Sequence, residues 1–251
     1  MVEHSASGRQ QPGDVGAADP AVAAALAAYA AGAGSEHAAL TALAVSRLLV
    51  PVVAVLAAAV AEAGGANESP PDAARSGTAE KVSEMALPTL VGRDGRLAVL
   101  AFTCLGSLTR WRPDARPVPV PADRVWQAGA QEASAVVIDV AGPVPLAVDG
   151  ARLAALAGGG TVPLPHEDPD VLAAAEAALA GETLITGARL AGPGDGSDIA
   201  LLVTLAPGCD PALAGAAVRR AVASLMARTG GRFRRGVEVA VVEAARTLSQ
   251  S

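Results

Sequence analysis

The chain has 251 residues, of which 51% are hydrophobic and 18% charged, a balance that supplies a packed core and disfavours wholesale disorder. Its formal net charge of −6 disfavours binding to nucleic acid or to an anionic membrane, because both need a positive protein surface. Only 2% of the residues are aromatic, so the core must be built from Ala, Val and Leu. Frequent Ala, Gly, Arg and Pro beside a single lysine, Lys81, indicate a high-GC bacterial gene.

Residues 1–18 mix Gly, Ser, Gln and charged side chains, which is typical of a disordered tail. No apolar segment of a secretory signal follows this polar start, so we expect a cytoplasmic protein. The longest apolar stretch, residues 48–61, is shorter than the roughly twenty residues that span a bilayer, and a buried strand leading into a short helix or loop is predicted there. Cys104 and Cys209 are far apart in the sequence and are expected to be free, buried thiols.

Three predicted helices begin with an aspartate followed by a proline. In each pair the carboxylate caps the helix and the proline occupies the first helical position. The pairs are Asp19-Pro20, Asp168-Pro169 and Asp210-Pro211, and the matching helix stops are Gly32, Gly181 and Gly230. A further helix is predicted over residues 36–46, directly before a strand over residues 48–56.

Residues 62–82 form a long polar loop with Gly-Gly and Pro-Pro pairs, which we expect to be mobile or functional. An Asp94-Gly95 turn between the apolar segments 87–91 and 97–103 predicts a β-hairpin, because this dipeptide suits the backbone of a tight turn. Downstream, helices are predicted over 106–111, 122–132 and 151–156, and strands over 116–120, 135–140 and 144–148.

A glycine-rich segment divides the chain into two predicted domains. Residues 158–167 are interpreted as a linker that joins a domain over residues 19–157 to a smaller one over residues 168–246. The smaller domain has the order helix, strand, strand, helix, strand, with strands over 183–190, 199–205 and 237–243. We therefore predict an α+β fold of two domains, each a mixed sheet covered by helices.

Residues 36–157 also carry a set of motifs that points to a known family. The motifs are the strand Leu48–Ala54, the Lys81 to Leu87 segment, the Asp94-Gly95 turn, Ala101–Thr103, Leu108 with Trp111, Ala115–Pro121 and Asp139–Pro143. In these motifs the chain resembles the SseB family of enhanced-serine-sensitivity proteins in its actinobacterial form. The resemblance implies an α+β fold with an SseB N-terminal domain, a family C-terminal domain from residue 168 onward, and a non-enzymatic role without catalytic residues.

The sequence contains no recognisable catalytic or cofactor motif. The glycine-rich segment 192–197 lacks a Walker lysine and is interpreted as a hairpin loop, so no cofactor is expected. His166, Glu167 and Asp168 beside Asp170 suggest a metal site, but a structural zinc needs about four ligands. We prefer a solvated linker with a helix cap, and therefore expect no bound metal.

Arginines cluster around Phe233 and on the preceding helix. The cluster contains Arg219, Arg220, Arg228, Arg232, Arg234 and Arg235. Such a patch can contact phosphate or acidic partners. The preferred interpretation is a solvated helix end, where the helix dipole stabilises positively charged arginines.

The candidate site consists of Thr103, Trp111, Arg116 and Asp139, which lie at strand ends or in the loops that join them, where a rigid sheet presents chemistry. Asp139 stands between apolar residues and would be costly if it were buried unpaired. A structural alternative pairs Asp139 with Arg116 across neighbouring strands, and a structural alternative for Trp111 is a core position.

These observations favour a non-enzymatic, cytoplasmic binding or regulatory protein with an unknown protein or small-molecule partner. Neither nucleic acid nor membrane is expected as a partner. One alternative is a small enzyme that uses Asp139, Thr103 and an arginine on an anionic metabolite, which requires these groups to converge in a pocket. Another alternative is a structural protein that forms homo-oligomers through Ala- and Val-rich surfaces.

Overall fold

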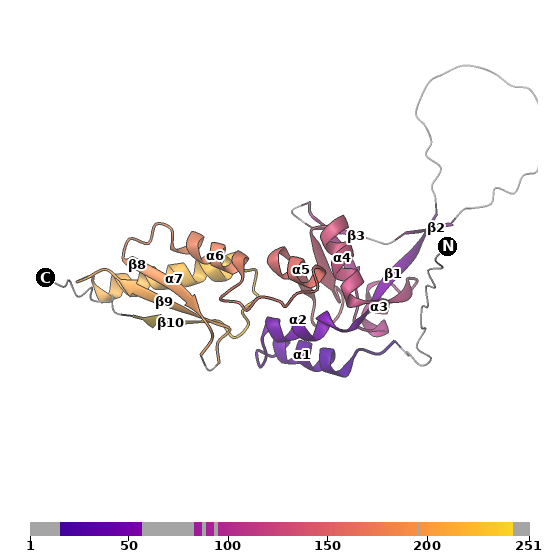
Figure 1. The fold of residues 1–251 in the computed structure, drawn as a ribbon, viewed down its shortest axis with the longest axis horizontal. Coiled ribbons are helices and arrows are strands. Elements are labelled where there is room, and N and C mark those ends of the chain that lie inside the picture. Colours follow the sequence, from indigo (N-terminus) through magenta and orange to yellow (C-terminus); the bar gives the residue numbers. More distant parts are fainter. Residues whose placement is uncertain (1–15, 57–82, 87–88, 93–94, 195, 243–251) are drawn as a thin grey trace, which may run out of the picture.

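The computed structural model of the protein describes residues 16–56, 83–86, 89–92, 95–194 and 196–242. We call residues 16–157 the N-terminal region and residues 169–242 the C-terminal region; Figure 1 shows them side by side along the long axis of the molecule. The division into two independent domains stays a prediction. The predicted loop over residues 62–82, and the predicted tail up to residue 15, lie outside the described residues.

Helices and two small sheets build the N-terminal region (Figure 1). Its helices are α1 (Pro20–Ala30), α2 (Glu36–Ala44), α3 (Leu105–Trp111), α4 (Ala122–Glu132) and α5 (Gly150–Ala157). Its strands are β1 (Arg47–Leu56), β2 (Ser83–Ala86), β3 (Thr89–Val91), β4 (Leu97–Ala101), β5 (Arg116–Pro121), β6 (Ala135–Ile138) and β7 (Leu146–Asp149). The sheet orders are β2-β1-β5, all antiparallel, and β3-β4-β6-β7, in which β4 and β6 run parallel.

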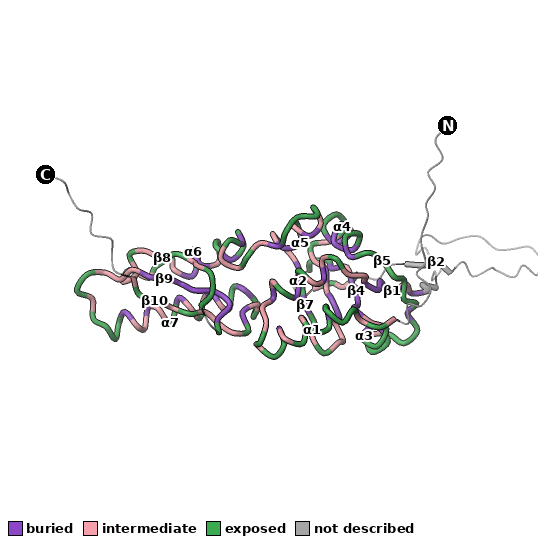
Figure 2. The backbone as a smooth tube through the Cα atoms, turned by 60° about the horizontal axis from the view of Figure 1, so that its bottom comes forward, coloured by how far each residue is buried: buried purple, intermediate pink, exposed green. Residues whose placement is uncertain are grey.

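The C-terminal region has the predicted αββαβ order. Its elements are α6 (Pro169–Leu179), β8 (Ile185–Ala191), β9 (Ile199–Leu205), α7 (Pro211–Arg228) and β10 (Val237–Val241). The central strand, β9, is largely buried (Figure 2) and pairs antiparallel with β8 and parallel with β10. The two helices pack against each other and against β8. With its helices and mixed sheets, the chain has an α+β fold.

The three predicted aspartate caps are confirmed. Asp19 accepts a hydrogen bond from the Ala21 N–H at 2.8 Å, and Asp210 accepts one from the Ala212 N–H at the same distance. Asp168 accepts one from the Asp170 N–H at 2.9 Å. Each cap satisfies a helix N–H that has no partner inside the helix.

The N-terminal core forms where α1, α2, α4 and α5 meet the sheets. Trp126 of α4 is fully buried at its centre, together with Leu40 and Leu43 of α2. Gly129 lets α4 approach β6 closely, because a Cβ at this position would overlap the side chain of Val136. The core has few aromatic side chains to fill space. Small residues keep it closely packed because they let neighbouring backbones approach each other.

The segment predicted as a linker packs against the N-terminal region. Val162 is buried in the N-terminal core, and the carbonyl oxygen of Pro163 lies 3.4 Å from Nδ1 of His37. Asp168 is fully buried. The prediction of a solvated linker at residues 166–168 is therefore wrong for Asp168, although this residue does cap α6 as expected.

Candidate functional site

Two of the four predicted site residues, Thr103 and Asp139, meet at one edge of the β3-β4-β6-β7 sheet. Because β4 and β6 are parallel neighbours, their carboxyl ends lie at the same edge, where Thr103 follows β4 and Asp139 follows β6. Oδ1 of Asp139 accepts a hydrogen bond from the Thr103 N–H at 2.9 Å, and Oγ1 of Thr103 donates to Oδ2 at 2.6 Å. Both residues are buried, so the carboxyl group is satisfied by threonine rather than by a cation.

Asp139 has two unusual properties. Burial raises the pKa of its carboxyl above the usual value, although hydrogen bonds from Thr103 and Ser107 act in the opposite direction. Its backbone has a φ of 49°, a conformation that non-glycine residues seldom adopt and that ends β6 at Ile138, two residues before the predicted end. Unusual backbone and a perturbed carboxyl occurring together are features of functional sites.

The structural alternative that paired Arg116 with Asp139 is wrong. Arg116 lies in β5, which pairs with β1, whereas Asp139 follows β6 in the other sheet. The Arg116 residue is exposed, opposite Val52 of β1. The strand order therefore separates two residues that the sequence suggested were neighbours.

Trp111 belongs to the core rather than to the site around Asp139. It is half-buried, and its ring centroid lies 5.6 Å from that of Phe102. The guanidinium of Arg112 lies over the tryptophan ring, 5.5 Å from the ring centroid. This arrangement matches the alternative that placed Trp111 in a core position.

A cavity of about 650 Å³ lies beside Thr103 and Asp139. One wall is α1, which contributes mainly alanines and Leu26. The polar end is formed by Thr103, Cys104, Ser107 and Asp139, and Arg110 of α3 also lines the cavity. The sequence pointed to the polar pair but not to α1, because nothing local indicates which helix covers a sheet edge.

Cys104 is the N-cap residue directly before α3, and it is half-buried rather than buried. Its Sγ accepts a hydrogen bond from the Ser107 N–H at 3.4 Å, so the thiol takes the place of the usual capping oxygen. Cys209 is also half-buried, and both cysteines are free as predicted. The expectation that both thiols are buried is therefore wrong.

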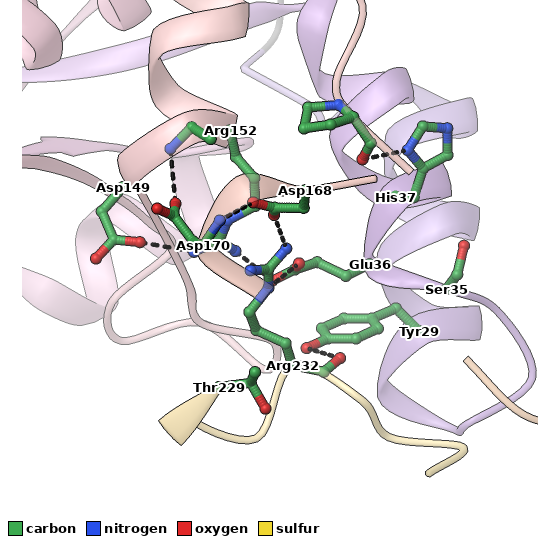
Figure 3. Close-up of polar contacts among 12 residues, drawn as sticks. Tyr29, Ser35, Glu36, His37, Asp149, Arg152, Asp168, Asp170, Thr229 and Arg232 are labelled. Atoms are coloured by element: carbon green, nitrogen blue, oxygen red, sulfur yellow. Dashed lines mark hydrogen bonds and ion pairs between the residues drawn. The ribbon is translucent and has the colours of Figure 1, made fainter. Parts of the chain in front are cut away.

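A second polar cluster joins the two regions, and the sequence did not indicate it (Figure 3). Glu36 of α2 binds Arg152 of α5 at 2.6 Å and Arg232 of the C-terminal region at 2.8 Å. Arg232 also binds the buried Asp168 at 2.7 Å. Asp170 accepts a hydrogen bond from the Ala151 N–H at 2.7 Å, so a carboxylate of one region caps a helix of the other.

The interpretation of the arginine cluster as a solvated helix end is wrong for Arg232. Burial would lower the pKa of its guanidinium, but Glu36 and Asp168 raise the pKa above its usual value, so the group stays charged. Arg235 is also paired, with Asp198 at 3.2 Å. The sequence showed only that these arginines are clustered, and a cluster of arginines does not identify their partners.

No metal centre occurs among the residues that the structure describes, since no three His, Cys, Asp or Glu side chains are arranged to hold an ion. His166 lies 3.8 Å from Glu167, its sequence neighbour, and its other ring nitrogen is buried. In the same described ranges, no helix is both long and apolar enough to cross a membrane.

Comparison with known proteins gives a family match. No curated protein and no solved structure matches the chain. The family described as SseB protein N-terminal domain matches residues 22–155, a range that includes most of α1, both sheets of the N-terminal region and most of α5. This match covers more than half of the chain and includes the Thr103–Asp139 edge together with the helix that covers it. The chain therefore belongs to the SseB family.

Proposed function

We propose that this protein is a non-enzymatic binding protein of the cytoplasm, and that its ligand is a small molecule held in the cavity between α1 and Asp139. The cavity, at about 650 Å³, is within the range of roughly 300–1,000 Å³ that small-molecule sites occupy. Its walls are mainly apolar and its polar groups are gathered at one end, as in sites that hold a ligand in one orientation. This combination of volume and one-sided polarity is the observation that carries the proposal.

The polar end favours a ligand with an anionic group. The Asp139 carboxyl already accepts hydrogen bonds from Thr103 and Ser107, so we expect it to line the cavity rather than to bind the ligand directly. Arg110 is exposed and has no ion pair among the residues with described positions, which leaves its guanidinium available to a ligand carboxylate, sulfonate or phosphate. The ligand class is therefore an amphipathic anion with its apolar body against α1.

A second candidate is a small enzyme acting on an anionic metabolite. It is favoured by the 2.6 Å hydrogen bond from the Thr103 hydroxyl to Asp139, a pairing of hydroxyl and base that nucleophilic catalysis uses. Arg110 lines the same cavity and takes the place of the arginine that this alternative requires. The binding proposal is preferred because Thr103 is only 6% exposed, which leaves its hydroxyl little access to a substrate.

The test uses a probe of matching chemistry, the fluorescent dye 1-anilinonaphthalene-8-sulfonate, which has apolar rings and one sulfonate. We expect saturable binding that Ala27→Trp reduces at least tenfold, because the new ring fills the cavity from α1. Ala24→Trp is the matched control: it places the same ring on the exposed surface of α1 outside the cavity lining, and should leave binding unchanged.

Arg110→Ala should weaken probe binding several-fold without changing the melting temperature, since the arginine is exposed. A thermal melt of each variant excludes dye binding to a loosened fold. Equal dye affinity in Ala27→Trp and wild-type protein would contradict the proposal. Turnover of an anionic substrate that is lost in Thr103→Val would instead favour the enzyme.

A further inference from the structure

A second cavity, of about 520 Å³, lies where the N-terminal and C-terminal regions meet. Its lining includes five arginines but only three carboxylates, in a chain whose net charge is −6. The arginines come from both regions: Arg96 and Arg152 from the N-terminal one, and Arg228, Arg232 and Arg234 from the C-terminal one. This cavity is separate from the one beside Asp139 and is therefore independent of the function proposed above.

Three of these arginines are already paired with carboxylates. Arg152 is bound to Glu36 and Asp149, and Arg232 is bound to Glu36 and Asp168, all at 2.6–2.8 Å. Figure 3 shows these side chains converging from α2, α5, the start of α6 and the segment after α7. Asp149 also binds Arg96 at 3.2 Å, so Glu36, Asp149 and Asp168 are all engaged by other arginines and none of them neutralises Arg228 or Arg234.

Arg228 and Arg234 are exposed and form no ion pair with any residue that the structure describes. Nε of Arg228 donates to the Ser224 hydroxyl at 3.3 Å, and the guanidinium of Arg234 lies 4.8 Å from the ring centroid of Tyr29. Both contacts leave the positive charge uncompensated. The cavity therefore has an excess of positive charge from arginines whose planar donors suit oxyanions.

Arg152, which also lines the cavity, has one donor that the described residues leave unsatisfied. Its side chain is only 6% exposed, and its two terminal nitrogens donate to Glu36 and Asp149. Its Nε is buried and has no hydrogen-bond partner among the described residues. A buried donor without a partner is costly and rare, and it belongs to a side chain that lines the cavity.

We propose that this cavity binds a small oxyanion metabolite, one that carries a phosphate or more than one carboxylate. Arg228 and Arg234, which are exposed and line the cavity, provide the charge and the accessible donors. The cavity is several times larger than one phosphate group, so the ligand has a body beyond its anionic group. Because its walls belong to both regions, the bound anion adds contacts across the boundary that Glu36 and Arg232 already join, and stabilises their docking.

The test titrates the full chain with inorganic phosphate, pyrophosphate and citrate at low ionic strength, by calorimetry and by thermal shift. Sodium chloride at matched ionic strength controls for screening. We expect at least one of the three anions to bind saturably and to raise the melting temperature more than sodium chloride does. Preference for pyrophosphate assigns phosphate as the recognised group, and preference for citrate assigns a polycarboxylate.

The double variant Arg228→Ala/Arg234→Ala should weaken this binding at least tenfold. The control is Arg189→Ala/Arg219→Ala, which removes the same charge from exposed arginines outside the cavity. Ala27→Trp should keep the anion affinity of the wild-type protein, since Ala27 lines the other cavity. The proposal is overturned if none of the anions stabilises more than sodium chloride, or if both double variants lose affinity equally.

Discussion

The carboxylate of Glu36 lies 2.8 Å from the guanidinium of Arg232, a residue 196 positions later in the chain. The same carboxylate binds Arg152 at 2.6 Å through its other oxygen. The side chains of Glu36 and Arg232 are 7% and 12% exposed, so the pair is shielded from water. One acidic residue at the start of α2 thus holds the N-terminal and C-terminal regions against each other.

Replacing Glu36 by glutamine should lower the free energy of unfolding by about 3–5 kcal/mol, because it leaves two buried arginines without their shared counter-charge. Urea denaturation measures the loss. Glu182→Gln is the control, since Glu182 pairs with the exposed Arg220 and its removal should cost far less. Equal losses in the two variants would show that Glu36 does not bridge the regions in solution.

Asp139 should make stability depend on pH in a defined direction. Burial raises its pKa above the usual 3.8, so the folded state binds this proton more tightly than the unfolded state does. This contribution is complete below pH 3.8 and is lost as the pH rises through the raised pKa. The unfolding free energy of Asp139→Asn, compared with wild type, should therefore increase across that interval and then level off. Denaturation over a pH series measures this difference, and a flat or falling difference would contradict the assignment.

Asp170 should stabilise α5 although it belongs to α6. Removing its carboxylate in Asp170→Ala leaves the Ala151 N–H without its acceptor and should cost about 1 kcal/mol, the usual value of a helix cap. Amide hydrogen exchange at Ala151 should become faster. Asp210→Ala removes the cap of α7 and should cost a similar amount without changing exchange at Ala151, which makes it the matched control.

Gly129 should resist enlargement. Gly129→Ala places a methyl group against the side chain of Val136 and should cost about 1–3 kcal/mol by overpacking the contact between α4 and β6. Val136→Ala makes room for that methyl group, so the double variant should lose less stability than the two single variants combined. Strict additivity in denaturant unfolding would contradict this contact.

The predictions that succeeded depend on short-range signals. An aspartate before a proline specifies a helix start within three residues, and all three such starts are confirmed. The antiparallel pairing of β3 with β4 confirms the predicted hairpin, although Asp94 of its turn lies outside the described residues. Thr103 and Asp139 were chosen because each lies at or near the end of a predicted strand. That the two ends meet follows from the parallel pairing of β4 and β6, which only the structure shows.

The predictions that failed depended on which strands pair and which regions dock, and the sequence alone shows neither. Arg116 and Asp139 are close in the predicted order of strands, but β5 and β6 belong to different sheets. Arg232 is indistinguishable from the exposed arginines around it until Glu36 and Asp168 are placed against it. A charged side chain in a sequence carries no signal of its burial when its counter-charge comes from a distant segment.

Local propensities, capping residues and apolar periodicity act over a few positions, so the amino-acid order alone already specifies the helices, the αββαβ unit and the residues at the strand ends. Packing acts across the whole chain. It places α1 over Asp139 to form an apolar cavity, and it brings the arginines of α7 and its following segment to Glu36. Both cavities therefore exist only in the folded protein, because each is lined by segments that the sequence keeps far apart.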